Sequence, residues 1–163
     1  MLVTRATPPD ASFEELDGIE QAFRVDYEAN WASGTQPYAG IVELLAALQA
    51  RDHSLAVLSN KPHKFTQAMV AGIFPAIHFS VVLGQRDGVP HKPDPTGALE
   101  IASCFGMAPE ECLIIGDSTI DLETAKNAGM RAIAVTWGFH DRDRLAEAHQ
   151  IADDPTSLLR LLD

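Results

Sequence analysis

The fold class of this chain is decided by the stretch Leu113-Ile114-Ile115-Gly116-Asp117-Ser118-Thr119-Ile120-Asp121. Its apolar run predicts a buried parallel strand, and Gly116 permits a sharp turn into a helix predicted from Ser118 to Ala128. Asp117 is then expected at the carboxyl end of the strand, with Asp121 one turn into the helix. Open α/β folds bind ligands in the crevice at that edge of the sheet. Two carboxylates there suit Mg²⁺, which uses one or two protein carboxylates and leaves room for water and phosphate.

A simpler interpretation of Gly116-Asp117-Ser118 is a turn followed by a helix N-cap. The longer pattern is more specific, because Asp121, Ala125 and Ala128-Gly129 follow at fixed spacing. Such a motif needs a strand, a turn and a helix in that order, and the sequence predicts all three. We therefore expect a metal or phosphate site here.

Strands and helices alternate along most of the chain, which predicts an α/β fold with a mainly parallel sheet. The breaker over residues 33–37 sets the first helix apart, so residues 1–37 are expected to form a separate helical element and residues 38–163 the α/β core. The predicted helices cover residues 12–30, 40–51, 62–71, 95–105, 118–128, 142–148 and 156–162, and the predicted strands cover residues 55–58, 79–83, 112–115 and 132–135.

Composition restricts the possible partners. The 163 residues carry a formal net charge of −11 and no basic patch, which argues against a nucleic-acid partner. A small phosphorylated ligand stays possible, because it needs only local positive charge. No apolar run reaches membrane-spanning length and no signal peptide is recognised, so no membrane partner is expected. Cys104 and Cys112 are expected to be buried free thiols, which predicts a cytoplasmic location.

Further polar groups follow the predicted strand at 55–58. The hydroxyl of Ser59 and the amide of Asn60 can bond phosphoryl oxygens, although they can equally cap the next helix, and both roles can coexist. Lys92 lies in His91-Lys92-Pro93-Asp94-Pro95, where two prolines fix the loop and can aim its ammonium group at a phosphate. An exposed loop lysine is the alternative. Asp94 is expected to cap the following helix.

The order Ser-Asn, Lys-Pro and Gly-Asp-Ser-x-x-Asp resembles motifs two, three and four of the haloacid dehalogenase superfamily. The resemblance covers roughly residues 12–163, and the phosphoglycolate phosphatase branch is the most similar, through Ser59-Asn60-Lys61-Pro62, residues 91–95 and Val135-Thr136-Trp137-Gly138. It implies a three-layer Rossmann-like core and Mg²⁺-dependent hydrolysis of a small phosphate monoester. Pyrophosphatase and phosphoglucomutase relatives share the same core motifs.

The resemblance also implies roles for individual residues. Ser59 and Asn60 would bind the phosphoryl group, and Lys92 would neutralise it and orient the nucleophile, which makes Lys92 the expected catalytic residue. Asp117 would coordinate Mg²⁺ and Asp121 would support that metal site. The helical segment within residues 1–37 would be part of the cap that closes over the substrate.

The superfamily's first motif, a strand ending in Asp-x-Asp-Gly-Thr, does not occur in this sequence. Asp141-Arg142-Asp143 has the spacing of the acid pair, but a poor strand precedes it and no Gly-Thr follows. The first Asp of the motif is the nucleophile, so this chain is expected to be inactive or nearly so. An amino-terminal truncation, a misassigned start and a deliberately shortened chain would each explain the difference. A non-catalytic phosphate-binding, metal-binding or interaction module on a degenerate core is the alternative function.

In the superfamily, the strand of the first motif lies between the strands that end at Ser59 and Asp117. Its neighbours would otherwise face a gap with unpaired backbone groups, which proteins rarely tolerate. We therefore expect closure by direct pairing of the two neighbouring strands, by Leu2-Val3-Thr4, or by a second chain. The last option makes a homodimer possible.

Overall fold

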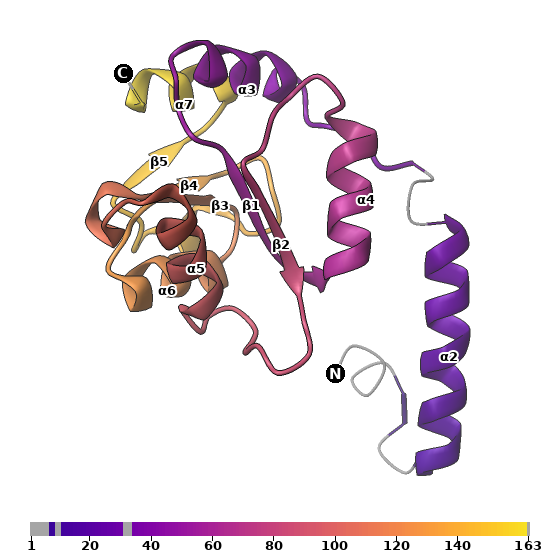
Figure 1. Cartoon of the computed structure of the whole chain (residues 1–163). Helices are drawn as coiled ribbons and strands as arrows, with labels where there is room; N and C mark the ends of the chain where they lie inside the picture. Colours follow the sequence, from indigo (N-terminus) through magenta and orange to yellow (C-terminus); the bar gives the residue numbers. More distant parts are fainter. Residues whose placement is uncertain (1–6, 9–10, 31–33, 163) are drawn as a thin grey trace. The chain divides into compact units, whose positions relative to one another are not determined.

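The computed structural model describes residues 7–8, 11–30 and 34–162. The chain divides into two compact units, Met1–Gln36 and Pro37–Asp163. Within the first unit, helix α2 (Phe13–Asn30) begins with a reciprocal cap (Figure 1). The Ser12 hydroxyl accepts a hydrogen bond from the Glu15 amide at 3.3 Å, and the Glu15 carboxylate accepts one from the Ser12 amide at 2.8 Å. The backbone bond from Ser12 lowers the pKa of Glu15. The assignment of residues 1–37 to a cap stays a prediction.

The second unit alternates helices and strands, which confirms the predicted α/β class. Two short 3₁₀ helices, Pro109–Glu111 and Arg142–Leu145, interrupt the alternation. Among the described residues, no helix has the length and hydropathy needed to cross a membrane. In chain order the regular elements are α3 (Ile41–Ala50), β1 (Ala56–Pro62), α4 (His63–Ile73), β2 (Val81–Gln85), α5 (Thr96–Phe105), β3 (Leu113–Gly116), α6 (Thr119–Ala128), β4 (Arg131–Val135), β5 (Gln150–Ala152) and α7 (Pro155–Leu161).

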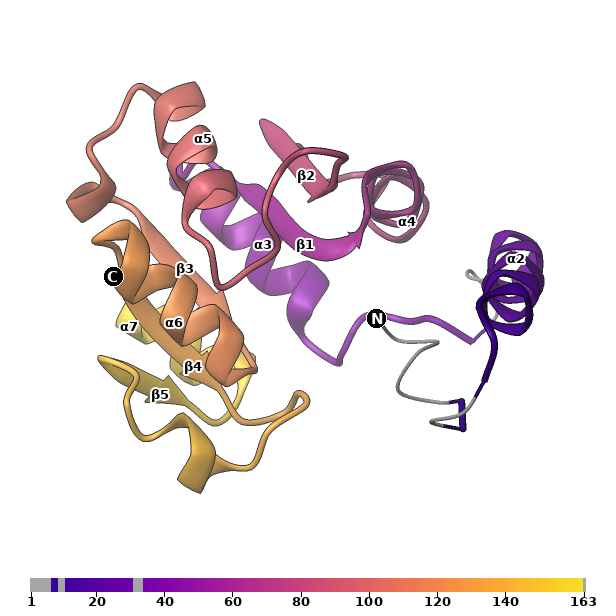
Figure 2. The same ribbon diagram turned by 90° about the horizontal axis from the view of Figure 1, so that it is seen from below.

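The strands form two parallel sheets, which Figure 2 shows as separate groups. One sheet has the order β1-β2 and the other has the order β3-β4-β5. Leu58 is in register with Leu83, Ile115 with Ile133, and Ala134 with Ile151. Because all pairs are parallel, the carboxyl ends of the strands within each sheet lie at one edge.

Of the three expected closures, direct pairing of β1 with β3 is wrong. Over the described parts of the chain, β1 pairs with β2 and β3 pairs with β4, and no hydrogen-bonded ladder joins the two sheets. Leu2-Val3-Thr4 lies outside the described residues. Closure by a second chain stays a prediction. The physical consequence is that β1 and β3 each have an edge without a ladder partner in the described chain, in addition to the outer edges of β2 and β5.

Strand β4 organises the core, because its successive side chains point to opposite faces of the sheet. Ala132 and Ala134 belong to a cluster with residues of α5 and α6, whereas Ile133 and Val135 pack with residues of α3 and α7. The result is a helix–sheet–helix arrangement in three layers, as the resemblance implies. It buries β4 on both faces.

Several local predictions need correction. The helix expected over residues 142–148 is only the 3₁₀ helix Arg142–Leu145, and β5 was not predicted. Three residues are too few to show a hydrophobic period, which is why β5 left no sequence signal. Cys104 is exposed rather than buried, and Cys112 is partly buried. Burial raises the pKa of the Cys112 thiol.

Substitution of Leu158 tests the packing of α7 in the core. Leu158 is 2% exposed, whereas Leu161 on the same helix is 36% exposed. Leu158→Ala should lower the free energy of unfolding by about 2–5 kcal/mol, because it leaves a cavity. Leu161→Ala should change it by about 0.5 kcal/mol or less. Urea denaturation of both variants measures the difference, and equal effects would contradict the burial of Leu158.

Candidate active site

The ammonium group of Lys92 connects strand β1 of one sheet to helix α6, which follows strand β3 of the other sheet. Its Nζ donates to the backbone oxygen of Leu58 in β1 at 3.0 Å and to Oδ1 of Asp121 in α6 at 2.6 Å. The side chains of Lys92 and Asp121 are only 16% and 10% exposed. A cation this far from water needs such partners, because desolvation is costly. The structure thus brings Lys92 and Asp121 together at the carboxyl edge of β1.

Asn60 holds the backbone of Lys92 from β1. Its Nδ2 donates to the Lys92 carbonyl oxygen at 3.0 Å, and its Oδ1 accepts from the Lys92 amide at 2.8 Å. This paired contact fixes where the Lys92 side chain begins. Asn60 therefore acts as a positioning residue for Lys92 in this structure, and its direct contact with a phosphoryl group stays a prediction.

Ser59 lies in the irregular end of β1, where the register with β2 shifts between Leu58 and Pro62. Its hydroxyl accepts a hydrogen bond from the Lys61 amide at 3.1 Å. It is therefore not the cap of α4, for which Pro62 is the N-cap residue. Ser59 directly precedes Asn60, which anchors the Lys92 loop. The contact of Ser59 with phosphate stays a prediction.

Asp121 uses both carboxylate oxygens in this structure. Oδ1 accepts from Lys92, and Oδ2 accepts from the Ser118 hydroxyl at 2.6 Å. Ser118 is the N-cap of α6 and accepts from the Asp121 amide at 3.4 Å, so the cap interpretation and the site interpretation both apply. A Cβ on Gly116 would lie 2.3 Å from the Asp121 Cβ, which explains why glycine precedes Asp117.

Asp117 is held by a loop after β4. Its Oδ2 accepts from the Phe139 amide at 2.8 Å, and its backbone oxygen accepts from the His140 amide at 3.1 Å. The His140 Nδ1 accepts from the Thr119 amide at 3.2 Å at the start of α6. The resemblance used Val135-Thr136-Trp137-Gly138, but the sequence gave no role to Phe139 or His140. Their contact is made through backbone amides, which leave no sequence signal.

The N-cap residue of α5 is Pro95, and Asp94, which was predicted to cap this helix, bonds instead to its first residue, Thr96. Oδ1 of Asp94 accepts from the Thr96 hydroxyl at 2.6 Å and from the Thr96 amide at 2.9 Å. These bonds, the hydroxyl bond first, lower the pKa of Asp94. The contact of Asp94 with Thr96 fixes the carboxyl end of the loop between Lys92 and α5.

The donor set fits a hard divalent cation with few protein ligands. Across the described part of the chain, no three His, Cys, Asp or Glu side chains converge on one point. Mg²⁺ is commonly bound by one or two carboxylates and otherwise by water and phosphate. Because both oxygens of Asp121 already bond to Lys92 and Ser118, Asp117 is the better candidate for direct coordination. Asp121 would support the site by holding Lys92.

Comparison with known proteins places these motifs in a family. The model of the haloacid dehalogenase-like hydrolases matches residues 6–135. The chain belongs to this family. It is 36% identical over 151 residues to the phosphoglycolate phosphatase of Salmonella typhimurium, a match that covers 91% of this chain and 60% of the relative. It is also 33% identical over 152 residues to the N-acetylmuramic acid 6-phosphate phosphatase of Pseudomonas aeruginosa, covering 91% and 67%.

A solved structure confirms the fold. A predicted phosphoglycolate phosphatase of Haemophilus somnus 129PT superposes with a TM-score of 0.86 at 28% sequence identity, covering 94% of this chain and 69% of that protein. This haloacid dehalogenase-like chain spans about three fifths of the length of the phosphoglycolate phosphatase from Salmonella typhimurium. The phosphoglycolate-phosphatase-like resemblance inferred from the motifs is therefore confirmed.

Substitution of Gly138 tests the close packing of the loop after β4 against the Asp117 side chain. A Cβ at Gly138 would lie 2.2 Å from both Cβ and Oδ2 of Asp117. Gly138→Ala should lower the free energy of unfolding by about 1–3 kcal/mol through overpacking, and it should shift the Phe139 amide resonance in NMR spectra. Phe139→Ala is the matched control, because it keeps the amide and removes only an exposed ring. If both variants were equally stable, the close packing would be wrong.

Asp94 provides a pH test. Its folded pKa is lowered, so its contribution to stability is present above the unfolded pKa of about 3.9 and is lost as the pH falls through the folded value. Asp94→Ala should therefore lower the urea midpoint at neutral pH, and the difference from the wild type should shrink as the carboxyl group protonates in acid. Asp87→Ala, in the preceding loop, should change the midpoint little at either pH. A deficit of Asp94→Ala that is constant with pH would contradict the stabilising role of the two Thr96 bonds to this carboxylate.

Proposed function

We propose that this chain carries the phosphate-binding and metal-binding part of a Mg²⁺-dependent phosphate monoester hydrolase of the phosphoglycolate phosphatase type. The observation that carries the proposal is the position of Lys92, whose ammonium group lies between the carboxyl end of β1 and Asp121. The 36% identity to a phosphoglycolate phosphatase supports the substrate class. The proposed substrate is a small phosphorylated metabolite. A sugar phosphate is the second candidate, because one relative is an N-acetylmuramic acid 6-phosphate phosphatase.

Lys92 would balance part of the negative charge of a bound phosphoryl group. Two features support this role. Asn60 fixes the Lys92 backbone, so the ammonium group needs little reorganisation when an anion arrives. Asp121 keeps the ammonium group at the sheet edge rather than in solvent. Ser59 would donate its hydroxyl hydrogen to a phosphoryl oxygen.

Asp117 would hold Mg²⁺, with Asp121 as its indirect support. The bound metal would neutralise charge on the phosphoryl oxygens. The chain's own contribution is to orient the carboxylate of Asp117 through the Phe139 amide. Asp117 would therefore coordinate the metal, whereas Asp121 would position the ammonium group of Lys92.

Catalysis by this chain alone is proposed to be negligible. The sequence contains no Asp-x-Asp-Gly-Thr, so the acid pair that attacks phosphorus and donates a proton has no counterpart here. Without a covalent nucleophile, the reaction must proceed in one difficult step. The alternative, a non-catalytic phosphate- or metal-binding module, predicts the same binding. A cytoplasmic location and homodimer formation are kept as further proposals.

Metal affinity tests the proposed site without requiring activity. Titration calorimetry with Mg²⁺ should show binding to the wild-type chain. Asp121→Asn should weaken it by about 10–100-fold, as expected for a residue that orients the site indirectly, and Asp117→Asn should weaken it at least as much. Glu123→Gln, on the exposed face of α6, is the matched control and should bind normally. Equal affinity in all four proteins would overturn the metal site.

Hydrolysis of p-nitrophenyl phosphate in the presence of Mg²⁺ tests the proposed inactivity. The wild-type chain should show no turnover above that of Asp117→Asn. Turnover that Asp117→Asn abolishes would mean that this chain supplies its own nucleophile, and the proposed inactivity would be wrong. Release of phosphate from phosphoglycolate, measured under the same conditions, would identify the substrate in that case.

A further inference from the structure

Residues 138–140, which follow β4 and which we call the support loop, are bonded to the turn that carries Asp117. The Phe139 amide donates to Oδ2 of Asp117 at 2.8 Å, and the His140 amide donates to the Asp117 backbone oxygen at 3.1 Å. A third bond uses a side chain of the loop, because the Thr119 amide donates to Nδ1 of His140 at 3.2 Å. The imidazole of His140 therefore ties the support loop to the start of α6.

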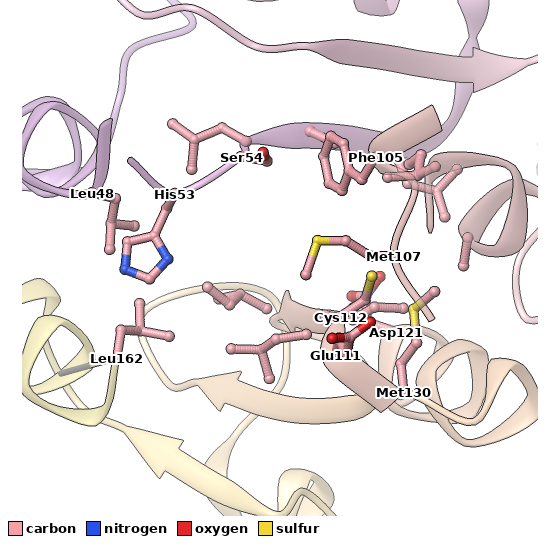
Figure 3. Close-up of a pocket in the computed structure, with 18 of the residues that line it drawn as sticks. Leu48, His53, Ser54, Phe105, Met107, Glu111, Cys112, Asp121, Met130 and Leu162 are labelled. Carbon is pink, nitrogen blue, oxygen red and sulfur yellow. The ribbon is translucent and has the colours of Figure 1, made fainter. Parts of the chain in front are cut away.

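Asp117 receives this support from the β4 side of β3. A cavity of about 310 Å³ lies on the β1 side of β3, and Figure 3 shows Asp121 among its lining side chains. Asp117, Phe139 and His140 do not line this cavity. The support loop is thus the part of the described chain that holds the Asp117 carboxylate.

Hydrogen bonds hold the support loop in place, because its side chains bury little surface. Phe139 is 79% exposed, and its ring contacts the His140 ring at a centroid distance of 4.8 Å. Segments with few buried apolar contacts open easily. The chain before the loop has its own anchor, since the Thr136 amide donates to the Ala152 backbone oxygen at 3.1 Å. The loop itself depends on its bonds to Asp117 and Thr119.

The orientation of the Asp117 carboxylate follows from the position of the Phe139 amide. The last torsion of an aspartate side chain has broad energy wells, so its partners decide how the carboxylate plane is turned. A Cβ on Gly138 would lie 2.2 Å from Oδ2 of Asp117, which shows how closely the loop approaches that oxygen. A displaced support loop would therefore turn the carboxylate or leave it without its amide partner.

The bond from Thr119 also assigns the proton of the His140 ring. Nδ1 accepts this bond and carries no hydrogen, so in the neutral ring the hydrogen lies on Nε2. Thr119 is the first residue of α6, and the first amides of a helix have no partner within the helix. His140 is partly buried and supplies that missing partner.

We propose that His140 is a positioning residue for the metal site. Nδ1 of its imidazole holds the support loop against α6, and the loop orients the Asp117 carboxylate through the Phe139 amide. The ring itself contacts neither the metal nor the substrate. The effect on metal binding rests on the proposed function, in which Asp117 coordinates Mg²⁺. The effect on the orientation of Asp117 does not, because the bonds exist in the chain without metal.

His149 makes the same kind of contact in another place and supplies the matched control. Its Nδ1 accepts from the Ala132 amide at 3.1 Å, and its own amide donates to the Ala132 backbone oxygen at 3.1 Å. Ala132 lies near the amino end of β4, whereas Asp117 follows the carboxyl end of the neighbouring β3. A histidine that only satisfies a backbone amide contributes to stability at either place. His140 alone of these two should affect Asp117.

Two measurements on the whole chain test the proposal: titration calorimetry with Mg²⁺, and NMR spectra of the Phe139 amide without metal. His140→Leu removes the acceptor and should weaken Mg²⁺ binding by about 10–100-fold. It should also move the Phe139 amide proton upfield, because a strong bond to a carboxylate is lost. His140→Asn keeps an acceptor at the δ position and should restore both. His149→Leu should lower the urea midpoint and leave both measurements as in the wild type.

The same bond can be removed from its donor, which covers the case that His140→Leu does not fold. Proline is tolerated at the first position of a helix, and Ser118 before it already has the extended backbone that a following proline requires. Thr119→Pro should therefore keep α6, lose the amide and reproduce both effects of His140→Leu. Thr119→Ala keeps the amide and should behave as the wild type.

Three results would overturn the proposal. The first is an unchanged Phe139 amide resonance in folded His140→Leu or folded Thr119→Pro. The second is that His140→Asn behaves as His140→Leu, and the third is that His149→Leu shifts the Phe139 amide equally, since a general loss of stability would then be the cause. If the wild-type chain binds no Mg²⁺, the proposed function fails, and the NMR measurement still decides the role of His140.

Discussion

The buried ammonium group of Lys92 is the constraint on which the site depends. It lies about 30 residues from each of its partners in the sequence, Leu58 and Asp121, and it joins β1 to the start of α6. A charge with so little exposure requires fixed partners, because an unpaired buried charge is strongly destabilising. Asn60 adds a second attachment to the same loop through the backbone of Lys92. The loop is therefore held from the side chain and from the main chain.

Close backbone packing makes this convergence possible. A Cβ on Gly97 would lie 2.7 Å from Leu58 Cδ1, so glycine at the start of α5 lets the helix approach β1 directly after the Lys92 loop. A Cβ on Gly116 would overlap Asp121, and one on Gly138 would overlap Asp117. Glycines thus adjoin both carboxylates of the site. The space left by these glycines is therefore as necessary to the site as its two carboxylates.

The α/β class and most elements follow from the sequence, because long apolar periods and capping residues are local signals. The strand–turn–helix around Asp117 is such a case, and so is the cap of α6 by Ser118. The support of Asp117 by the Phe139 amide could not be predicted, since a backbone amide has no residue preference. The sequence also could not decide among the three expected closures between β1 and β3, of which direct pairing does not occur. Pairing between strands depends on which neighbours are present, and local patterns do not encode that.

Cooperativity of folding is the remaining consequence of the two separate sheets. In the described chain no backbone ladder joins β1-β2 to β3-β4-β5, so the connection rests on side chains. They include the contacts of α3 with α7, those of α5 with α6, and the ion pair of Lys92 with Asp121. We expect side-chain contacts to couple the opening of the two sheets less tightly than a shared backbone ladder would. Proteins open locally in contiguous cooperative units. We therefore expect the β1–α4–β2 segment and the β3–α6–β4–β5 segment to open as two hydrogen-exchange units, each with its own opening free energy.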